Sequence, residues 1–349
     1  MIDRSEFFEP TPIPEPIIDL EAERQQAHEK QISRPQISQF AKDIARGLSA
    51  TQKFIPSKYL YDALGSALFD SICRLREYEC TRGELRILQR AKTQIAEMCS
   101  PDVTVVELGG GDGAKARVLL PAFTEASREV QFHDVDVSAA AIEACGTAMR
   151  NVPGVQYHGH ISEYLHGITE VVETSSGQLL VLFLGSSIGN YGTDEADEFL
   201  RAVRSRLRTG DLFLLGTDLV KPREVLEKAY DDPQGVTAAF NKNVLARINA
   251  ELGGTFDLSQ FRHEARWVPR LNRIEMHLVS QSAQYVEITD AAMMVRFENG
   301  ESIHTESSHK YELEKITPWL NAAGFDVVAQ WVDDHAQFAT TLCAAPNSA

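Results

Sequence analysis

Apolar residues gather in four short runs along the middle of the chain, separated by segments with helical periodicity. Unbroken apolar runs of this kind are typical of strands buried on both faces of a sheet. Strands that alternate with helices form a parallel sheet with right-handed crossovers, and ligands of such sheets bind beyond the carboxyl ends of the strands. The predicted strands cover residues 103–108, 130–137, 178–184 and 211–217, and the last of them follows a helix predicted over 195–207.

The pattern differs on either side of this region. Helices are predicted over 36–48 and 81–97, and a turn at 57–61 precedes another helix that ends near residue 73. From residue 221 onward, helical patterns give way to runs in which apolar and polar residues alternate, which indicates an antiparallel sheet with one exposed face. These helices are predicted over 224–230 and 235–252, and the alternating runs over 273–279, 284–288 and 302–308.

The end of the chain predicts a helix over 313–323 and a hairpin formed by 325–332 and 338–344. This hairpin would return to the parallel sheet as an antiparallel edge. We therefore expect an α/β fold with a second, smaller α+β domain. The expected division is a peripheral tail over 1–34, the smaller domain over 35–82 and 220–309, and a sheet domain over 83–219 and 310–349.

Composition narrows the class of partner. The 349 residues include 34 basic and 50 acidic side chains, and this net charge of −16 argues against a nucleic acid or an anionic membrane surface. Five scattered cysteines show no metal or disulfide spacing, and no signal peptide or membrane-spanning run is recognisable. We expect a cytoplasmic monomer that acts on a small molecule.

The first candidate for a ligand-binding site is the glycine turn of residues 109–113, which follows the first predicted strand. Glycines let the backbone approach a ligand closely and adopt positive φ, and the helix that starts at Ala114 offers free N–H groups. The spacing of Gly109, Gly111 and Ala114 also fits the dinucleotide fingerprint, so a nicotinamide cofactor is an alternative. Glu107 suits a cofactor that carries positive charge. A dinucleotide-binding domain, in addition, does not need the terminal hairpin. Both features favour S-adenosylmethionine.

Two histidine-containing stretches, residues 133–136 and 158–160, are possible metal ligands. In a strand, however, His133 and Asp134 point to opposite faces, and zinc needs at least three converging ligands. We expect no metal site. Asp136, at the end of the second strand, is the better acceptor for ribose hydroxyls, with Asp134 a structural or solvated neighbour.

A set of motifs in a fixed order resembles one known family, the histidine-specific Nα-methyltransferases that form hercynine in ergothioneine biosynthesis. The resemblance covers about residues 45–345 and implies a Rossmann-like class I methyltransferase sheet with S-adenosylmethionine as cofactor. It also implies that the smaller domain, over 35–82 and 220–309, is a substrate domain that binds the amino acid. The motifs are Lys58-Tyr-Leu-Tyr-Asp, Gly65-Ser-Ala-Leu-Phe, Glu77-Tyr, Glu107-Leu-Gly, Phe183-Leu-Gly-Ser-Ser-Ile-Gly-Asn, Gly216-Thr-Asp-Leu-Val-Lys, Tyr230-Asp-Asp, Ala239-Phe-Asn-Lys-Asn-Val-Leu, Arg273-Ile-Glu-Met and Thr305-Glu.

The resemblance also implies roles for individual residues. It places Tyr61, Phe69 and Tyr78 around the substrate amine and the transferred methyl group. Asn190 and Tyr230 would bind the substrate carboxylate, and Met276 would pack on the imidazole. Glu306 with Ser308 would accept hydrogen bonds from the ring N–H groups and tune them. The implied cofactor site comprises Glu107, Gly109, Gly111, Lys115, Asp136, Gly185 and Ser187.

Each role has a chemical reason. Aromatic faces hold a methylated ammonium, which has lost its hydrogen-bond donors, by cation–π attraction of about 0.5–2 kcal/mol. Neutral donors on Asn190 and Tyr230 would bind a carboxylate without repelling the sulfonium. A carboxylate at Glu306 that accepts from an imidazole would contribute about 1.5–3 kcal/mol. By pattern alone, Met276 would be a core residue and Glu306 a solvated one, so their assignment depends on the motifs.

Three positions depart from the family pattern. His160-Ile161 stands where an acidic residue for the adenine amino group is expected, Ser187 replaces threonine, and Ser307 replaces an aliphatic residue. Two other functions stay open at this point. One is a methyltransferase of the same fold that acts on an indole or aryl amino acid or an alkaloid precursor. The other is a cofactor-binding module without catalysis.

Overall fold

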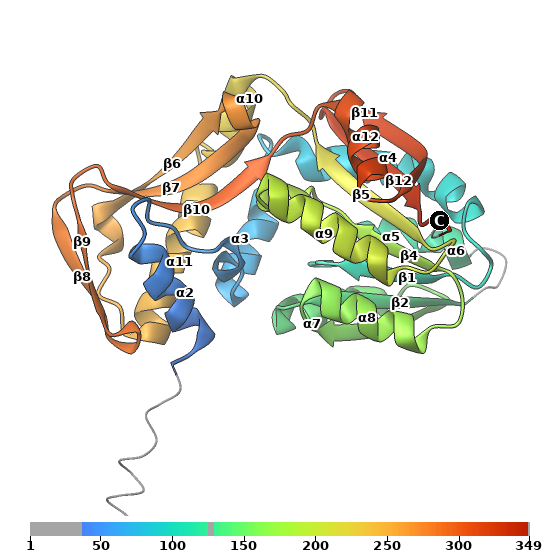
Figure 1. The fold of residues 1–349 in the computed structure, drawn as a ribbon, viewed down its shortest axis with the longest axis horizontal. Helices are drawn as coiled ribbons and strands as arrows, with labels where there is room; N and C mark the ends of the chain where they lie inside the picture. Colours follow the sequence, from blue (N-terminus) through green and yellow to red (C-terminus); the bar gives the residue numbers. More distant parts are fainter. Residues whose placement is uncertain (1–36, 125–128, 348–349) are drawn as a thin grey trace, which may run out of the picture. The chain divides into compact units, whose positions relative to one another are not determined.

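Seven strands form one sheet, in the order β11-β12-β5-β4-β1-β2-β3. The computed structural model describes residues 37–124 and 129–347 (Figure 1). Strands β1 to β5 pair in parallel, whereas β12 is antiparallel to both β5 and β11. The predicted parallel sheet and its antiparallel hairpin are therefore confirmed. The strands are β1 (Thr104–Leu108), β2 (Val130–Asp136), β3 (Val155–Ile161), β4 (Leu179–Phe183), β5 (Leu212–Asp218), β11 (Asp326–Asp333) and β12 (Phe338–Ala344).

Helices cover both faces of this sheet, which explains why β1, β4 and β5 are buried along their whole length. Apolar side chains of α8 (Tyr164–Thr174), α9 (Thr193–Arg206) and α12 (Leu313–Ala322) pack on one face. Those of α4 (Glu79–Glu97), α5 (Ala114–Leu119), α6 (Pro121–Thr124) and α7 (Ala139–Met149) pack on the other. No helix of the described residues is both long and apolar enough to cross a membrane.

A second group of strands is antiparallel throughout. Three of them form a sheet in the order β10-β7-β6, and the other two form a separate hairpin. Their bounds are β6 (Phe261–Val268), β7 (Arg273–Ser280), β8 (Gln284–Ile288), β9 (Met293–Phe297) and β10 (Ser302–His309). β6 and β9 were not predicted from the sequence, and neither was β3 of the larger sheet, whose residues do not form an apolar run. β6 shows no alternation because only Phe261 is fully buried, and its register along β7 holds it in place.

Four helices pack with these strands around one apolar core. They are α2 (Gln39–Leu48), α3 (Ala63–Cys73), α10 (Arg223–Tyr230) and α11 (Val236–Leu252). Ile87 of α4 and Phe338 of β12 belong to the same core, and residues 40–349 form one compact unit. The predicted division into a substrate domain and a sheet domain therefore stays a prediction, and the predicted tail over 1–34 lies outside the described residues.

We predict that replacing Gly83 with alanine destabilises the fold. A Cβ at this position of α4 would lie 2.3 Å from the Cβ of Ala336, in the turn between β11 and β12. Alanine normally favours a helix by about 1 kcal/mol, but overpacking of this kind costs about 1–3 kcal/mol. Gly83→Ala should lower the free energy of unfolding measured with urea. Thr93→Ala, at an exposed position of the same helix, is the control and should not. A more stable Gly83→Ala protein would contradict the prediction.

Candidate active site

The glycine turn leaves β1 with its backbone in the left-handed region at Gly109, Gly111 and Gly113. The amide of Gly109 donates to the carbonyl of Val135 at 2.8 Å, which ties the turn to β2. A Cβ at Gly109 would lie 2.8 Å from the hydroxyl of Tyr164, whereas a Cβ at Gly111 would meet no atom within 4 Å. Tyr164 therefore packs against the turn at Gly109. The turn is open at Gly111, where a ligand can approach the backbone.

Two buried carboxyl groups lie beneath this turn. Glu107 and Asp134 are register neighbours on β1 and β2, and both are almost fully buried. Burial, followed by the nearby Asp134, raises the pKa of Glu107 to about 8, and burial raises the pKa of Asp134 to about 7. Within the described residues, one oxygen of each group has no hydrogen-bond partner. Asp134 is thus a structural neighbour and not a solvated one, and a cation at the turn would stabilise both carboxylates.

The carboxyl ends of β2 and β3 form the next part of the site. Asp136 is the last residue of β2, and its carboxylate accepts from the amide of Ser138 at 2.8 Å. His160, in the place where an acidic residue was expected, lies with a ring nitrogen 2.9 Å from His133. Ile161, the last residue of β3, exposes an apolar side chain at this edge of the sheet. Neither residue 160 nor residue 161 therefore provides the carboxylate that the family pattern places here for the adenine amino group.

Glu84 is a residue of this site that the sequence analysis missed. Its fully buried carboxylate accepts from the amide of Gly185 at 2.8 Å and pairs with the ammonium of Lys115 at 2.9 Å. A Cβ at Gly216 would lie 2.0 Å from Glu84, so β5 needs glycine at this point. A signal was present in the sequence, because Glu84 lies on the apolar face of α4 together with Ile87. A charge on a buried helix face is a candidate for function.

The site has two halves, a cofactor half around the glycine turn and a substrate half around β10. The segment after β4 joins them. Gly185 faces Lys115, since a Cβ on this glycine would lie 2.8 Å from the lysine nitrogen. The hydroxyl of Ser187 donates to the carbonyl of Leu184 at 3.0 Å and holds the turn. A 3-10 helix, η2 (Ser187–Asn190), then brings Asn190 to Glu306, where the amide donates to the carboxylate at 3.2 Å.

β10 supplies the polar side chains of the second half. Glu306 and Ser308 are two residues apart and lie on one side of the strand, and Met276 of β7 is the register partner of Glu306. The hydroxyl of Tyr61 donates to Glu306 at 3.3 Å. Burial raises the pKa of Glu306 to about 7, so its charge depends on pH in the physiological range.

A row of aromatic rings connects Glu306 with Ser308. Tyr61 contacts Phe69 with 5.5 Å between ring centroids, Phe69 contacts Tyr78 at 6.4 Å, and Tyr78 contacts Tyr230 at 6.0 Å. The hydroxyl of Tyr230 donates to that of Ser308 at 2.8 Å. Burial raises the pKa of Tyr61, Tyr78 and Tyr230, which keeps all three phenols neutral. The candidate substrate residues are thus brought together.

Two further residues belong to this half and were not predicted. Phe240 of α11 packs on the rings of Tyr61 and Phe69, at 5.5 and 6.0 Å. Lys310, just after β10, donates to the hydroxyls of Tyr230 and Ser308 and pairs with Asp218. Phe240 lies inside a motif that the sequence analysis quoted, whereas a single lysine after a strand gave no signal.

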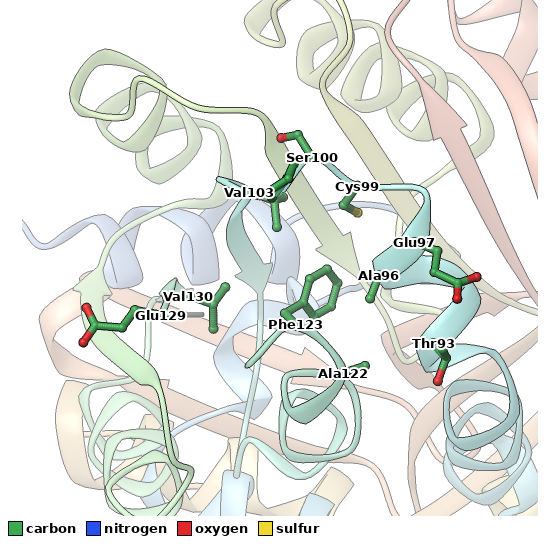
Figure 2. Close-up of a pocket in the computed structure, with 11 residues that line it drawn as sticks. Thr93, Ala96, Glu97, Cys99, Ser100, Val103, Ala122, Phe123, Glu129 and Val130 are labelled. Carbon is green, nitrogen blue, oxygen red and sulfur yellow. The ribbon is translucent and has the colours of Figure 1, made fainter. Parts of the chain in front are cut away.

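Other features of the molecule lie apart from this site. A cavity of about 390 Å³ opens near Val103 and Val130, at the amino-terminal ends of β1 and β2 (Figure 2). The glycine turn follows the opposite, carboxyl end of β1, so the cavity is not part of the site. Over residues 37–124 and 129–347, no three His, Cys, Asp or Glu side chains are grouped to hold a metal ion.

Residues 40–345 match the family described as histidine-specific, S-adenosylmethionine-dependent methyltransferases. The chain belongs to this family. A histidine N-alpha-methyltransferase of Mycobacterium tuberculosis is 41% identical, over 87% of this chain and 94% of that relative. Its counterpart in Mycolicibacterium smegmatis is 41% identical, over 86% and 93%. Ergothioneine biosynthesis protein 1 of Schizosaccharomyces pombe is 30% identical, over 82% of this chain and 38% of its own length.

Membership of this family confirms the resemblance and the cofactor predicted from the sequence, and the site fits that cofactor. S-adenosylmethionine carries a sulfonium and an ammonium group. The two unpartnered carboxyl oxygens under the turn would supply the complementary charge when ionised, and the open backbone at Gly111 leaves room above them. The individual contacts assigned to Glu107, Gly109, Lys115, Asp136, Gly185 and Ser187 stay predictions.

We predict that Gly111→Ala weakens binding of S-adenosylhomocysteine by about tenfold or more, equivalent to about 1.4 kcal/mol, because the new methyl group occupies the space above the turn. The control is Gly300→Ala in the turn before β10. Both glycines have positive φ and no atom within 4 Å of an added Cβ, so both variants should lose about 1–2 kcal/mol of stability. Calorimetry should show weaker binding for Gly111→Ala alone. Equal affinities would show that the cofactor does not lie on this turn.

Proposed function

We propose that the protein transfers methyl groups from S-adenosylmethionine to the α-amine of L-histidine. Three transfers give Nα,Nα,Nα-trimethylhistidine, or hercynine, a step of ergothioneine biosynthesis. The observation that carries this proposal is the buried carboxyl of Glu306 with its donors Tyr61 and Asn190, beside the row of aromatic rings. The identity of 41% to the mycobacterial histidine N-alpha-methyltransferases, along nearly their whole length, supports it.

The polar residues are suited to histidine. Glu306 accepts hydrogen bonds, and in its ionised form it would bind an imidazole N–H with a charge-assisted bond. Met276, next to Glu306 in register, offers an apolar surface to the ring. Asn190 and Tyr230 bring an amide and a phenol as donors for the substrate carboxylate. We assign the imidazole to Glu306, Ser308 and Met276, and the carboxylate to Asn190 and Tyr230.

The aromatic residues are suited to the amine and its methylated products. Each transfer removes a hydrogen-bond donor from the amine, and the final product is a quaternary ammonium. Tyr61, Phe69 and Tyr78 contact one another in sequence and can attract such a cation without hydrogen bonds, by about 0.5–2 kcal/mol each. We assign these three side chains to the region where the amine and the methyl group meet.

The bound cofactor supplies an electrophilic methyl carbon on a sulfonium. The chain then has to align the amine with this carbon and exclude water, since in-line displacement needs no covalent enzyme intermediate. The segment after β4 serves this alignment, because Gly185 faces the cofactor half and Asn190 faces the substrate half. The buried, neutral rings around Phe69 keep the amine away from solvent.

We extend the proposal to the setting in which the enzyme works. The cysteines at residues 73, 80, 99, 145 and 343 are all free, which suits the reducing cytoplasm. The net charge of −16 suits a small-molecule substrate and not a nucleic acid. We propose that the protein acts in the cytoplasm as a monomer.

The proposed function is tested by following product mass during incubation with S-adenosylmethionine. Histidine should gain one, two and then three methyl groups, whereas tryptophan and tyrosine should gain none. Their rings are larger than imidazole, and tyrosine presents no N–H to Glu306. Methylation of tryptophan or tyrosine, with histidine left unchanged, would refute the assignment and favour an aryl or indole substrate. If S-adenosylhomocysteine also failed to bind, the enzymatic function itself would be refuted.

We also predict how histidine binding depends on pH. With a pKa of about 7, Glu306 is ionised above neutrality and protonated below it, so its charge-assisted bond is present at pH 8 and lost at pH 6. Glu306→Gln should bind histidine about tenfold more weakly at pH 8, and the difference from wild type should shrink as pH falls through 7. Calorimetry with S-adenosylhomocysteine present measures both affinities.

The ionisation of histidine itself is the same for both proteins, so the difference between them isolates Glu306. Glu264→Gln, which removes a carboxylate from β6 paired with Arg266, is the control and should follow the wild-type profile. A difference between Glu306→Gln and wild type that stays constant from pH 6 to 8 would contradict a titration of Glu306 in this range.

A further inference from the structure

The strand β10 has one residue more than its partner β7 at the point where Glu306 lies. His304 pairs with His277, and Glu306 pairs with Met276. Thr305 is therefore an extra residue in the pairing, which defines a β-bulge. An extra residue changes the side of the strand to which the following side chains point. The bulge thus decides which side chains of β10 face the substrate half of the site.

The side chains before and after the bulge show this change. Ile303 pairs with Leu278, and both are buried in the apolar core. In a regular strand, every second residue after Ile303 shares its side, which would include Thr305 and exclude Glu306. With the bulge, Glu306 lies opposite Met276, another member of that core. The carboxylate of Glu306 reaches the substrate half only because of the extra residue.

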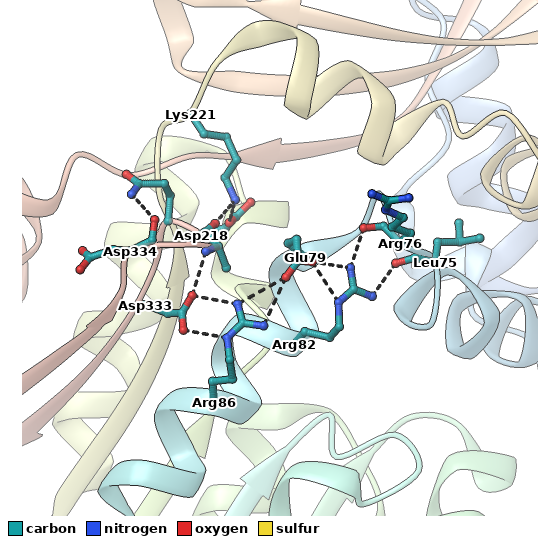
Figure 3. A network of polar contacts seen from close by, with 11 residues as sticks. Leu75, Arg76, Glu79, Arg82, Arg86, Asp218, Lys221, Asp333 and Asp334 are labelled. Atoms are coloured by element: carbon teal, nitrogen blue, oxygen red, sulfur yellow. Dashed lines mark hydrogen bonds and ion pairs between the residues drawn. The ribbon is translucent and has the colours of Figure 1, made fainter.

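Both ends of β10 are held independently of this bulge. Before it, the amide of His304 donates to the carbonyl of Lys53 at 2.8 Å. Just after the strand, Lys310 pairs with Asp218 of β5 at 2.9 Å. Asp218 is itself fixed by Lys221, which donates to its other oxygen at 2.6 Å (Figure 3). The strand therefore cannot shift as a whole, and the extra residue has to be accommodated between His304 and Lys310.

Within these limits, one other position of the bulge keeps both ends in place. Thr305 would then pair with Met276, and Glu306 would become the extra residue. Pairing would resume as before at Ser307, so this shift changes the orientation of Glu306 and leaves the rest of the strand in register. The contacts that hold the bulge at Thr305 therefore decide whether Glu306 faces the substrate half.

A buried asparagine of α11 holds the bulge at Thr305. The hydroxyl of Thr305 donates to Oδ1 of Asn241 at 2.6 Å, and the carbonyl of Met276 lies 3.0 Å from the same hydroxyl. Thr305 and Asn241 are both almost fully buried. A bulge at Glu306 would move this hydroxyl and leave the buried amide oxygen without its donor. Asn241 lies in the motif that starts at Ala239 and has no role in the proposed function.

The orientation of Asn241 is fixed by its other contacts. Its Nδ2 donates to the carbonyl of His277 at 3.2 Å and to Nδ1 of His263 at 2.9 Å. A carbonyl only accepts, so the amide nitrogen must face His277 and the amide oxygen must face Thr305. Burial lowers the pKa of His263, which keeps its ring neutral and lets Nδ1 accept. The Nε2 of the same ring donates to the carbonyl of Tyr230 at 2.7 Å.

We propose that Asn241 and Thr305 are positioning residues, which hold the bulge of β10 at Thr305 and thereby turn Glu306 toward the imidazole of the substrate. This inference rests on the proposed function, because it takes Glu306 as the group that binds the histidine ring. Neither positioning residue touches the ligand in this role. They act through Glu306 alone, since a shift of the bulge leaves Ser308 and the aromatic rings where they are.

The test measures how much Glu306 contributes to histidine binding in different backgrounds. Calorimetry at pH 8 with S-adenosylhomocysteine present gives the affinity lost on Glu306→Gln, which should be about tenfold in the wild type. Thr305→Val removes the hydroxyl, and in this background Glu306→Gln should cost about threefold or less, because Glu306 no longer faces the ligand. Thr305→Ser keeps the hydroxyl and should restore the loss of about tenfold. If Thr305→Val does not fold, Thr305→Ala replaces it, since it also removes the hydroxyl.

Asn241→Ala removes the acceptor of the same bond and should lower the effect of Glu306→Gln in the same way. Two variants are matched controls and should leave that effect at the wild-type value. Asn249→Ala removes another asparagine of α11, which binds the backbone of Phe256 through both its oxygen and its nitrogen. Thr104→Val changes a buried threonine at the amino-terminal end of β1.

The possible outcomes separate the two proposals. If the wild type does not bind histidine, the proposed function fails and this inference fails with it. If the wild type binds histidine, but Glu306→Gln costs as much affinity in the Thr305 variant that folds as in the wild type, the inference fails and the function stands. The same conclusion follows if the controls lower this cost as well. A smaller cost in the Thr305 and Asn241 variants, restored in Thr305→Ser, supports the inference.

Discussion

The buried ion pair between Asp218 and Lys310 connects the two parts of the structure on which the site depends. Asp218 is the last residue of β5, and Lys310 directly follows β10. The backbone joins at the same point, because the amide of Tyr311 donates to the carbonyl of Asp218 at 2.9 Å. Removing one partner of a buried pair usually costs about 3–5 kcal/mol. This pair therefore holds the polar face of β10 against the carboxyl edge of the parallel sheet, where both ligands are expected.

The two halves of the site use buried charge in opposite ways. In the substrate half, Asp218 pairs with both Lys310 and Lys221, and Lys310 also donates to the hydroxyls of Tyr230 and Ser308. In the cofactor half, burial and the neighbouring Asp134 raise the pKa of Glu107 although the nearby Lys115 lowers it, and burial raises the pKa of Asp134. A cofactor that carries positive charge relieves this repulsion.

Much of the fold could be predicted from local pattern. Strands buried on both faces appear as unbroken apolar runs, and the glycines at 109, 111 and 113 mark a turn that needs positive φ. The prediction failed at β6, where arginine, histidine and glutamate mask a strand that its pairing with β7 and the burial of Phe261 hold in place. Candidate site residues could be named from motifs and their roles stay predictions, but their mutual contacts could not be predicted. Tyr61 and Glu306, which share a hydrogen bond, are 245 positions apart.

The sequence by itself determined the cofactor turn, the parallel sheet with its hairpin, and the motifs that identify the family. These features are local, since periodicity and glycine placement act over a few residues. Only the tertiary structure decided which buried charges are paired. Glu84 bridges Gly185 and Lys115, and Lys310 meets Asp218, through packing between segments far apart in the chain. The sequence does not distinguish a solvated charged side chain from a buried one. The role of such a side chain follows from the partner that the fold brings within hydrogen-bond distance.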